Sequence, residues 1–190
     1  MSNKTIIFSA PSGSGKSTVV QHLLGLHPEF EFSISATSRA PRGTEKDGVE
    51  YYFIEAGEFR KLIAGDAFVE YEEVYRDRFY GTLKKEVERI WAKGNVIVFD
   101  VDVKGGVNLK KYFGDRALSV LIVPPSTRIL EQRLRGRGTD GEEAIRERLE
   151  KAGWELDFAR GKFDVEIVND VLEDTFRKAE RIIDDFLSKP

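Results

Sequence analysis

The chain contains no cysteine among its 190 residues, and it has only two histidines. The lack of cysteine excludes disulfide bonds, thiolate metal ligands and thiol catalysis. His22 and His27 lie five residues apart near the end of a predicted helix, which favours surface or packing roles over metal binding. The chemistry of this chain must therefore come from other residue types.

Long apolar runs and a strong net charge are also missing. The apolar run at residues 6–8 is too short for the core of a signal peptide, and no run approaches the length of a membrane span. A net charge of −3 argues against a general nucleic-acid surface. We expect a cytoplasmic globular protein, with no membrane or nucleic-acid partner. The sequence carries no signal for a particular oligomeric state.

Residues 10–18, with the sequence Ala-Pro-Ser-Gly-Ser-Gly-Lys-Ser-Thr, are the most informative stretch. They follow a β-branched run at residues 5–9 and open a segment with helical periodicity at 16–25. A strand, a Gly-rich turn and a helix in this order direct backbone N–H groups and the helix N-terminus at a phosphate. We expect Lys16 to contact the β- and γ-phosphates of a nucleotide and Ser17 to hold Mg²⁺.

This P-loop match departs from the usual pattern at one position. The pattern G-x-x-x-x-G-K-[ST] begins with glycine, and this chain has Ala10 there. The alternative interpretation is a Gly/Ser-rich turn that only caps a helix. The predicted strand before the turn and the predicted helix after it favour the nucleotide site over this alternative.

Short apolar strands alternate with amphipathic helices, which predicts an α/β fold with a parallel sheet between helices. The predicted strands are 5–9, 95–102, 117–123 and 163–168, and the predicted helices include 16–25, about 127–135, 142–159 and the C-terminal stretch. Two segments interrupt this core of residues 1–32, 83–125 and 161–190. Residues 33–82 predict a small, mainly β insertion, and residues 126–160 predict a helical, arginine-rich unit.

Asp100 and Asp102 end the apolar strand predicted at 95–102. An acid at the carboxyl end of a buried strand beside a P-loop is the usual second anchor for Mg²⁺ and its waters. The D-x-D spacing places both side chains on one face of a strand. The alternative is a strand end that turns into solvent, where aspartate is common.

Arginines of the helical unit could clamp phosphates. Arg133 and Arg137 are four residues apart and would share a helix face, and Arg148 belongs to the next predicted helix. Guanidinium groups on a movable unit suit transferring phosphates because their bidentate contacts are strong. The alternative is a solvated basic helix face.

A second candidate anion site involves Arg39 and Arg42, three residues apart, with Tyr51 and Tyr80 as candidate hydroxyl donors. Glu70 lies in an otherwise apolar strand and needs a partner. A carboxylate can accept two parallel N–H bonds, which guanine offers at N1–H and its 2-amino group and adenine does not. The structural alternative for Glu70 is a carboxylate that holds a neighbouring arginine such as Arg39.

These features together resemble the guanylate kinase family, within the nucleoside-monophosphate kinase superfamily, and the resemblance runs from end to end. Residues 32–42 resemble the signature S-x-T-T-R-x-P-R of that family. The other matching motifs are the P-loop and residues 47–53, 68–70, 79–82, 100–102, 133–138 and 167–170. So many motifs in the same order are highly specific.

The resemblance implies transfer of a phosphoryl group from ATP to GMP with Mg²⁺ as cofactor, residues 33–82 as a GMP-binding insertion and 126–160 as a lid. It implies ATP binding by Pro11, Ser12, Gly13, Ser14, Gly15, Lys16, Ser17, Thr18, Asn169 and Asp170. It implies GMP binding by Ser35, Arg39, Arg42, Tyr51, Glu70, Tyr80, Thr82, Asp100 and Asp102. The implied catalytic residues are Lys16, Arg133, Arg137 and Arg148, and the implied metal ligands are Ser17 and Asp100.

The chain departs from the family pattern at Ala10, at Ser38 in place of threonine, and at Lys104, where glutamine is usual after the D-x-D. Two other functions stay open on the sequence alone. One is a non-catalytic guanylate-kinase-like domain that binds proteins, but such domains typically have a degraded P-loop. The other is a P-loop kinase for a different nucleoside monophosphate, or a simple ATPase.

Overall fold

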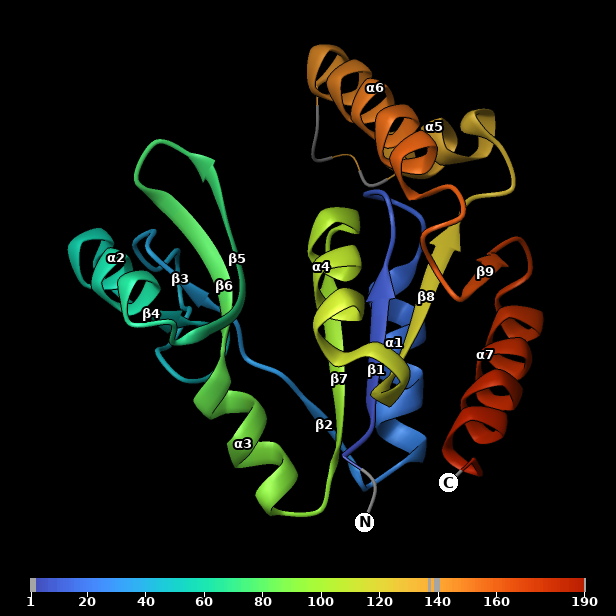
Figure 1. The fold of residues 1–190 in the computed structure, drawn as a ribbon. Coiled ribbons are helices and arrows are strands. Elements are labelled where there is room, and N and C mark those ends of the chain that lie inside the picture. The colour runs from blue at the N-terminus through green and yellow to red at the C-terminus, as the bar shows by residue number, and fades with distance from the viewer. Residues whose placement is uncertain (1–2, 137, 139–140, 190) are drawn as a thin grey trace.

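A computed structural model describes residues 3–136, 138 and 141–189. It consists of a central sheet with helices on both faces, a β-rich unit beside the sheet and a pair of helices at one end of it (Figure 1). In the described part of the chain, no helix is both long and apolar enough to cross a membrane.

The central sheet has five parallel strands in the order β2-β7-β1-β8-β9. These strands are β1 (Thr5–Ser9), β2 (Phe30–Phe32), β7 (Val96–Val101), β8 (Ala117–Val123) and β9 (Val165–Val168). Strands β1 and β8 are buried along their whole length, as expected for parallel strands covered on both faces. The predicted parallel sheet is confirmed, although β2 was not predicted and β9 begins two residues later than expected.

Two apolar clusters cover the two faces of this sheet. On one face, α1 (Lys16–Leu26) and α7 (Leu172–Leu187) pack on Ile6 and Phe8 of β1. On the other face, α3 (Lys84–Ala92) and α4 (Val103–Phe113) pack on Ile7 of the same strand. Because β1 alternates between the two clusters, its carboxyl end is fixed from both sides, and the P-loop begins there.

Residues 33–82 build a second sheet with the order β4-β3-β6-β5. Its strands are β3 (Ala36–Thr37), β4 (Tyr52–Phe53), β5 (Phe68–Tyr75) and β6 (Arg78–Leu83). The segment also contains α2 (Ala56–Ala64), which was not predicted. The buried Phe59 of α2 stacks on Phe68 and Phe79 at ring-centroid distances of 4.4 and 5.2 Å. The segment therefore has an aromatic core of its own.

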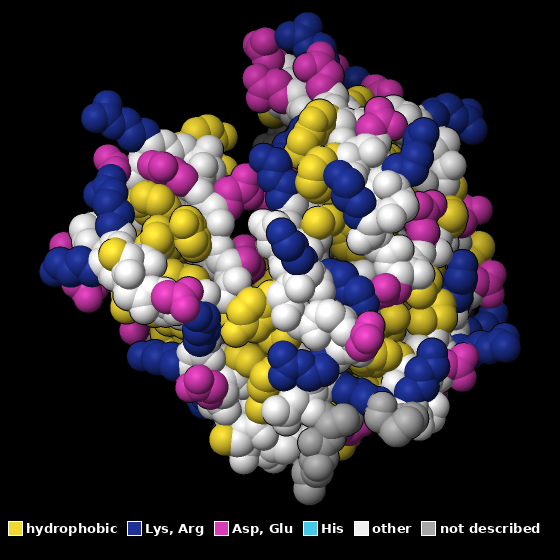
Figure 2. Space-filling model, in the orientation of Figure 1, with side chains coloured by type: hydrophobic (Ala, Val, Ile, Leu, Met, Phe, Trp, Pro, Cys, Tyr) yellow, Lys and Arg dark blue, Asp and Glu magenta, His cyan; other side chains and the backbone are white. Residues whose placement is uncertain are grey.

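Residues 126–160 contain α5 (Thr127–Gly136) and α6 (Glu142–Ala159), which pack together through Leu130, Leu134 and Ala152. The Ser126 hydroxyl accepts a hydrogen bond from the Ile129 N–H at 3.2 Å, so the predicted N-cap is confirmed. Figure 2 shows that the molecule is hollowed between these helices and the β-rich segment, with acidic and basic side chains at the border of the hollow.

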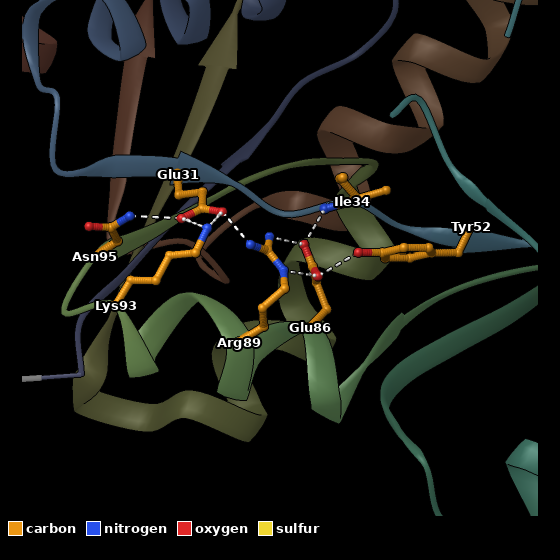
Figure 3. A network of polar contacts seen from close by, with 7 residues as sticks. All are labelled: Glu31, Ile34, Tyr52, Glu86, Arg89, Lys93 and Asn95. Atoms are coloured by element: carbon orange, nitrogen blue, oxygen red, sulfur yellow. Dashed lines mark hydrogen bonds and ion pairs between the residues drawn. The ribbon is translucent and has the colours of Figure 1, made fainter. Parts of the chain in front are cut away.

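A polar network joins the β-rich segment to the central sheet (Figure 3). Glu86 of α3 is buried and accepts hydrogen bonds from Ile34 N–H at 3.1 Å, Tyr52 hydroxyl at 2.9 Å and the Arg89 guanidinium. Burial would raise the pKa of Glu86, but these hydrogen bonds outweigh it and hold the pKa below its usual range. Arg89 continues the network to Glu31 of β2 at 2.5 Å. The network thus fixes where the segment leaves the sheet.

Candidate nucleotide-binding site

The P-loop has the backbone that its sequence predicts. Gly13 and Gly15 have φ values of 91° and 89°, in the left-handed region that glycine adopts freely. A Cβ atom on Gly15 would lie 2.2 Å from the side-chain amide of Asn169, so the position has no room for a larger residue. Among the described residues, positive φ values outside glycine occur only at Asp66 and Asp77. The backbone of Ala10 is therefore unstrained, and its departure from the pattern does not disturb the loop.

A cavity of about 320 Å³, here called the P-loop cavity, lies over this turn and is lined by residues 10–18, Asp102, Lys151 and Glu155. The ammonium group of Lys16 contacts the Asp100 carboxylate. Burial lowers the pKa of Lys16 to about 8, against the opposing effect of Asp102 and Glu155. The Lys16 ammonium group thus places a positive charge beside an anion-binding turn.

The Ser17 hydroxyl donates a hydrogen bond to Asp100 Oδ2 at 3.3 Å, so the two predicted metal ligands lie together. Asp102 differs from the expectation, because β7 ends at Val101 and Asp102 lies one residue beyond the strand. It caps α4 instead, where its Oδ1 accepts from Gly105 N–H at 2.8 Å. In the described part of the chain, no group of three or more His, Cys, Asp or Glu side chains forms a ready metal site.

A second cavity of about 320 Å³, here called the Glu70 cavity, opens beside the first, and Asp102 lines both. Six predicted GMP-binding residues line it: Ser35, Tyr51, Glu70, Tyr80, Asp100 and Asp102. The Thr82 hydroxyl, another predicted residue, donates to Glu70 Oε1 at 3.0 Å. Residues from the β-rich segment and from the end of β7 therefore converge on one cavity.

Glu70 has an unusual electrostatic environment. Burial raises its pKa to about 7, and the nearby Asp102 and Glu72 carboxylates add to this shift, while the Thr82 hydroxyl opposes it. Its side-chain hydrogen-bond partner among the described residues, the Thr82 hydroxyl, is neutral and does not compensate the charge of the carboxylate. A carboxylate in this state gains from any ligand that offers it N–H donors.

Arg39 is paired with Glu45 and not with Glu70. Its two terminal nitrogens donate to the Glu45 carboxylate at 2.6 and 2.8 Å, and its Nε donates to the Tyr80 hydroxyl at 3.2 Å. The guanidinium lies 4.9 Å from the ring centroid of Tyr51. The structural alternative for Glu70, a bond to Arg39, is therefore wrong.

Glu45 was not singled out from the sequence. It also accepts a hydrogen bond from the backbone N–H of Arg42 at 2.8 Å, and Arg39 holds the pKa of Glu45 near 2. The side chain of Arg42 is exposed. An acid three residues after Arg42, beside two arginines in a proline-containing loop, was the signal that could have identified it.

Arginines of α5 and α6 contact the P-loop and the segment that supports it. Arg148 donates to the Ser12 hydroxyl at 2.9 Å, and Arg133 donates to the Asn169 carbonyl at 2.8 Å. The second terminal nitrogen of Arg133 and the Ser14 hydroxyl are buried without a hydrogen-bond partner among the described residues. Unsatisfied buried donors beside a phosphate-binding turn fit an anionic ligand. Arg137 lies outside the described residues.

Asn169 and Asp170 follow β9 and differ in exposure. Asn169 is buried, and its amide joins two elements, donating to the Ser14 carbonyl at 2.8 Å and accepting from the Thr175 hydroxyl at 3.0 Å. Asp170 is exposed. Asn169 thus supports the P-loop from behind.

Two residues of α6 at the P-loop cavity were not predicted, Lys151 and Glu155. Glu155 is buried, and burial raises its pKa, with the Lys151 ammonium 3.7 Å away in opposition. They lie three and seven residues after Arg148, a helical spacing, so a shared helix face was the signal that could have found them.

A family model described as guanylate kinase matches residues 2–186. A guanylate kinase of Bacteroides fragilis is 58% identical over 184 residues, covering 97% of this chain and 90% of its own. One of Porphyromonas gingivalis is 52% identical, covering 98% and 99%. The crystal structure of guanylate kinase from Anaplasma phagocytophilum aligns with a TM-score of 0.74 at 29% identity, covering 98% of this chain and 87% of that one. The chain belongs to the guanylate kinase family.

Proposed function

We propose that this protein transfers the γ-phosphoryl group of ATP to GMP and releases ADP and GDP. The observation that carries the proposal is the pair of adjoining cavities, one built on the P-loop and one on Glu70, which meet at Asp102. Family membership supports it, since relatives over nearly the full length are named guanylate kinase. A donor and an acceptor nucleotide would then meet at the carboxyl ends of β1 and β7.

We assign the P-loop cavity to the phosphates of ATP. The backbone N–H groups of residues 12–18 and the N-terminus of α1 favour anionic groups, and Lys16 adds a positive charge. From the lid, Arg148 contacts Ser12 of this loop and Arg133 contacts the neighbouring Asn169, and Arg137 belongs to the same proposed set. The buried terminal nitrogen of Arg133 that has no partner among the described residues could donate a hydrogen bond to a phosphate oxygen. We place Asn169 and Asp170 near the adenine.

The Ser17 hydroxyl and the Asp100 carboxylate fit a magnesium ion. Both are hard oxygen ligands and they lie 3.3 Å apart beside the P-loop. Mg²⁺ in such sites usually takes one or two protein oxygens and completes its shell with waters and substrate phosphates. When bound, the metal would neutralise part of the charge on the phosphate chain.

We assign the Glu70 cavity to GMP. Its phosphate would be bound by Arg39, Arg42, Tyr51 and Tyr80. Both tyrosines line the cavity, and the Arg39 guanidinium contacts the Tyr80 hydroxyl and the Tyr51 ring. The guanine would be read by Ser35, Glu70 and Thr82. The ionised Glu70 carboxylate can accept from both N1–H and the 2-amino group of guanine.

The reaction needs no side-chain nucleophile. A phosphate oxygen of GMP attacks the γ-phosphorus of ATP in line, the bond from this phosphorus to the bridging β-phosphate oxygen breaks, and ADP leaves with that oxygen. The protein positions the two nucleotides and offsets charge on the transferring group with Lys16 and the lid arginines. We propose that residues 33–82 and 126–160 close over the substrates to exclude water.

An assay of ADP formation with each nucleoside monophosphate tests this proposal. We expect turnover with ATP and GMP, and little with AMP, CMP or UMP. Turnover without any acceptor would identify an ATPase, and turnover with another monophosphate would identify a different kinase. A protein that binds nucleotides without turnover would instead fit a non-catalytic domain.

Replacing Glu45 by glutamine is expected to raise the KM for GMP roughly tenfold with little change in kcat, because charge-assisted bidentate pairs are the strong ones. Arg39 has five N–H donors, and four of them are already used by Glu45, Tyr80 and the Ala40 carbonyl. We infer that Glu45 orients Arg39 and leaves one N–H for the proposed phosphate of GMP.

Steady-state kinetics with GMP as the varied substrate measure this effect. Glu58→Gln is the matched control, since Glu58 is an exposed acid on α2 in the same segment. A fall in the KM of the Glu45 variant would mean that Glu45 competes with the phosphate for Arg39, contrary to an orienting role.

A further inference from the structure

Lys104 touches each of the three parts of the molecule. It lies in the first turn of α4, two residues after Asp102, at the end of the central sheet. Its ammonium nitrogen is 3.1 Å from Glu72 Oε1 on β5 of the β-rich segment. The same nitrogen is 5.2 Å from the ring centroid of Trp154 on α6. One side chain therefore contacts the proposed GMP-binding insertion and the proposed lid from the core.

The helix that carries Lys104 does not explain this residue. A cation in the first turn of a helix faces the positive end of the helix dipole, which is unfavourable. The first turn of α4 contains no acidic residue, and the cap, Asp102, already bonds to Gly105 N–H. The favourable interactions of Lys104 thus come from Glu72 and Trp154, which belong to other parts of the chain.

Glu72 connects Lys104 to the Glu70 cavity. It lies directly across from Tyr80 in the β5–β6 pairing and lines the cavity two residues from Glu70. The ion pair with Lys104 therefore sets the distance between this edge of the cavity and the strand end that carries Asp100. A ligand that fills the cavity acts on Glu72 through the same strand pair.

Trp154 connects Lys104 to the P-loop cavity. It lies on α6 between Lys151 and Glu155, which line that cavity, and its ring stacks on Phe158 at 5.2 Å. The indole is about half exposed, at 48%. A lysine ammonium at this distance attracts the ring face, so the position of α6 depends on where Lys104 lies.

We propose that Lys104 couples the two substrate sites and is a positioning residue for the phosphoryl transfer. Occupation of the Glu70 cavity by GMP fixes Glu72, Glu72 fixes the Lys104 ammonium, and the ammonium holds Trp154 and α6 over the P-loop. GMP thereby tightens the binding of the ATP phosphates, and ATP tightens the binding of GMP by the same factor. This inference rests on the proposed function, because it needs both nucleotides in their proposed sites.

The first test measures this coupling directly. The affinity for a non-hydrolysable ATP analogue is measured by calorimetry with and without saturating GMP, in the presence of Mg²⁺. In the wild-type protein we expect GMP to raise the affinity for the analogue, and the ratio of the two affinities is the coupling factor. In Lys104→Met we expect this factor to shrink about threefold, as suits a partly exposed ion pair and a cation–π contact. Lys111→Met, an exposed lysine at the other end of α4, is the control and keeps the wild-type factor.

The second test follows the lid. The chain has two tryptophans, so Trp91→Phe leaves Trp154 as the only indole. In that background we expect GMP alone to change the Trp154 emission, although Trp154 does not line the Glu70 cavity. Lys104→Met and Glu72→Gln are each expected to abolish the change, and the double variant is expected to behave as either single variant does.

The outcomes separate the two proposals. If the wild-type protein fails to bind GMP, the proposed function is overturned and this inference with it. If it binds GMP and turns over, but Lys104→Met keeps the coupling factor and the emission change, only the inference is overturned. A wild-type protein in which GMP leaves the affinity for the ATP analogue unchanged would also overturn the inference alone.

Discussion

Replacing Lys16 by methionine is expected to lower kcat by a factor of about 10²–10³ while leaving the fold and GMP binding intact. Lys16 begins α1 directly after the Gly-rich turn and lines the P-loop cavity. Burial lowers its pKa to about 8, so its ammonium still carries the charge at neutral pH. On the proposed mechanism this charge offsets the negative charge of the transferring phosphoryl group, a role that methionine cannot take.

The lowered pKa of Lys16 also predicts how its replacement by methionine changes the stability of the fold. The pKa of Lys16 is lower in the folded protein than the usual 10.5, so the folded state binds this proton less tightly than the unfolded state does. The charged lysine therefore costs stability at neutral pH, and Lys16→Met should melt at the wild-type temperature or above. A variant that is inactive because it is unfolded would contradict this expectation.

Turnover, GMP affinity and thermal melting of the Lys16 variant together check the prediction. Lys85→Met, an exposed lysine on α3, is the matched control and should keep normal turnover. Near-normal activity of Lys16→Met would remove the P-loop from the mechanism. Loss of GMP affinity equal to the loss of kcat would place Lys16 at the other nucleotide.

Features encoded by neighbouring residues were predictable from the sequence. The strand, turn and helix around residues 5–26 follow from a β-branched run, glycines and an apolar period, and each is confirmed. The start of α5 follows from the hydroxyl of Ser126. Strand β8 is a continuous apolar run that is buried on both faces. In each case the local chemistry and the tertiary environment favour the same conformation.

Features that depend on distant partners were not predictable in the same way. Strands β3 and β4 have two residues each and exist because β3 pairs with both β6 and β4. Helix α2 is short and has Gly57 in its first turn, so its apolar periodicity is a weak signal. The helix is stabilised by the stacking of Phe59 on the aromatic rings of β5 and β6. Glu155 reaches the P-loop cavity only because α6 packs over it.

Replacing Glu70 by glutamine is expected to raise the KM for GMP strongly and to narrow the preference for GMP over AMP by about a hundredfold or more, since sites built on such hydrogen bonds reject analogues by up to about 10⁴–10⁵. The glutamine amide keeps one acceptor oxygen, but its NH₂ group faces a donor of the guanine. AMP gains from the change, because its unprotonated N1 can accept from that NH₂ group.

The pH dependence of kcat/KM for GMP gives a second readout of Glu70. Its pKa is raised to about 7, so the carboxylate that accepts both guanine donors forms only as the pH rises through 7. We expect kcat/KM for GMP to increase as the pH rises through 7 and to fall again above pH 8, where Lys16 loses its proton. The GMP phosphate, with a second pKa near 6, contributes its own increase. Only the part due to Glu70 should disappear in Glu70→Gln.

Two controls show whether Glu70 reads the base or only supports the fold. Thermal melting should not fall, because Arg39 is held by Glu45 and because a raised carboxyl pKa means that ionised Glu70 costs stability above pH 7. Glu73→Gln, at an exposed acid on the same strand that does not line the Glu70 cavity, should keep the base preference. If Glu70→Gln keeps the full preference for GMP, the base is read elsewhere, and Ser35 and Thr82 become the leading candidates.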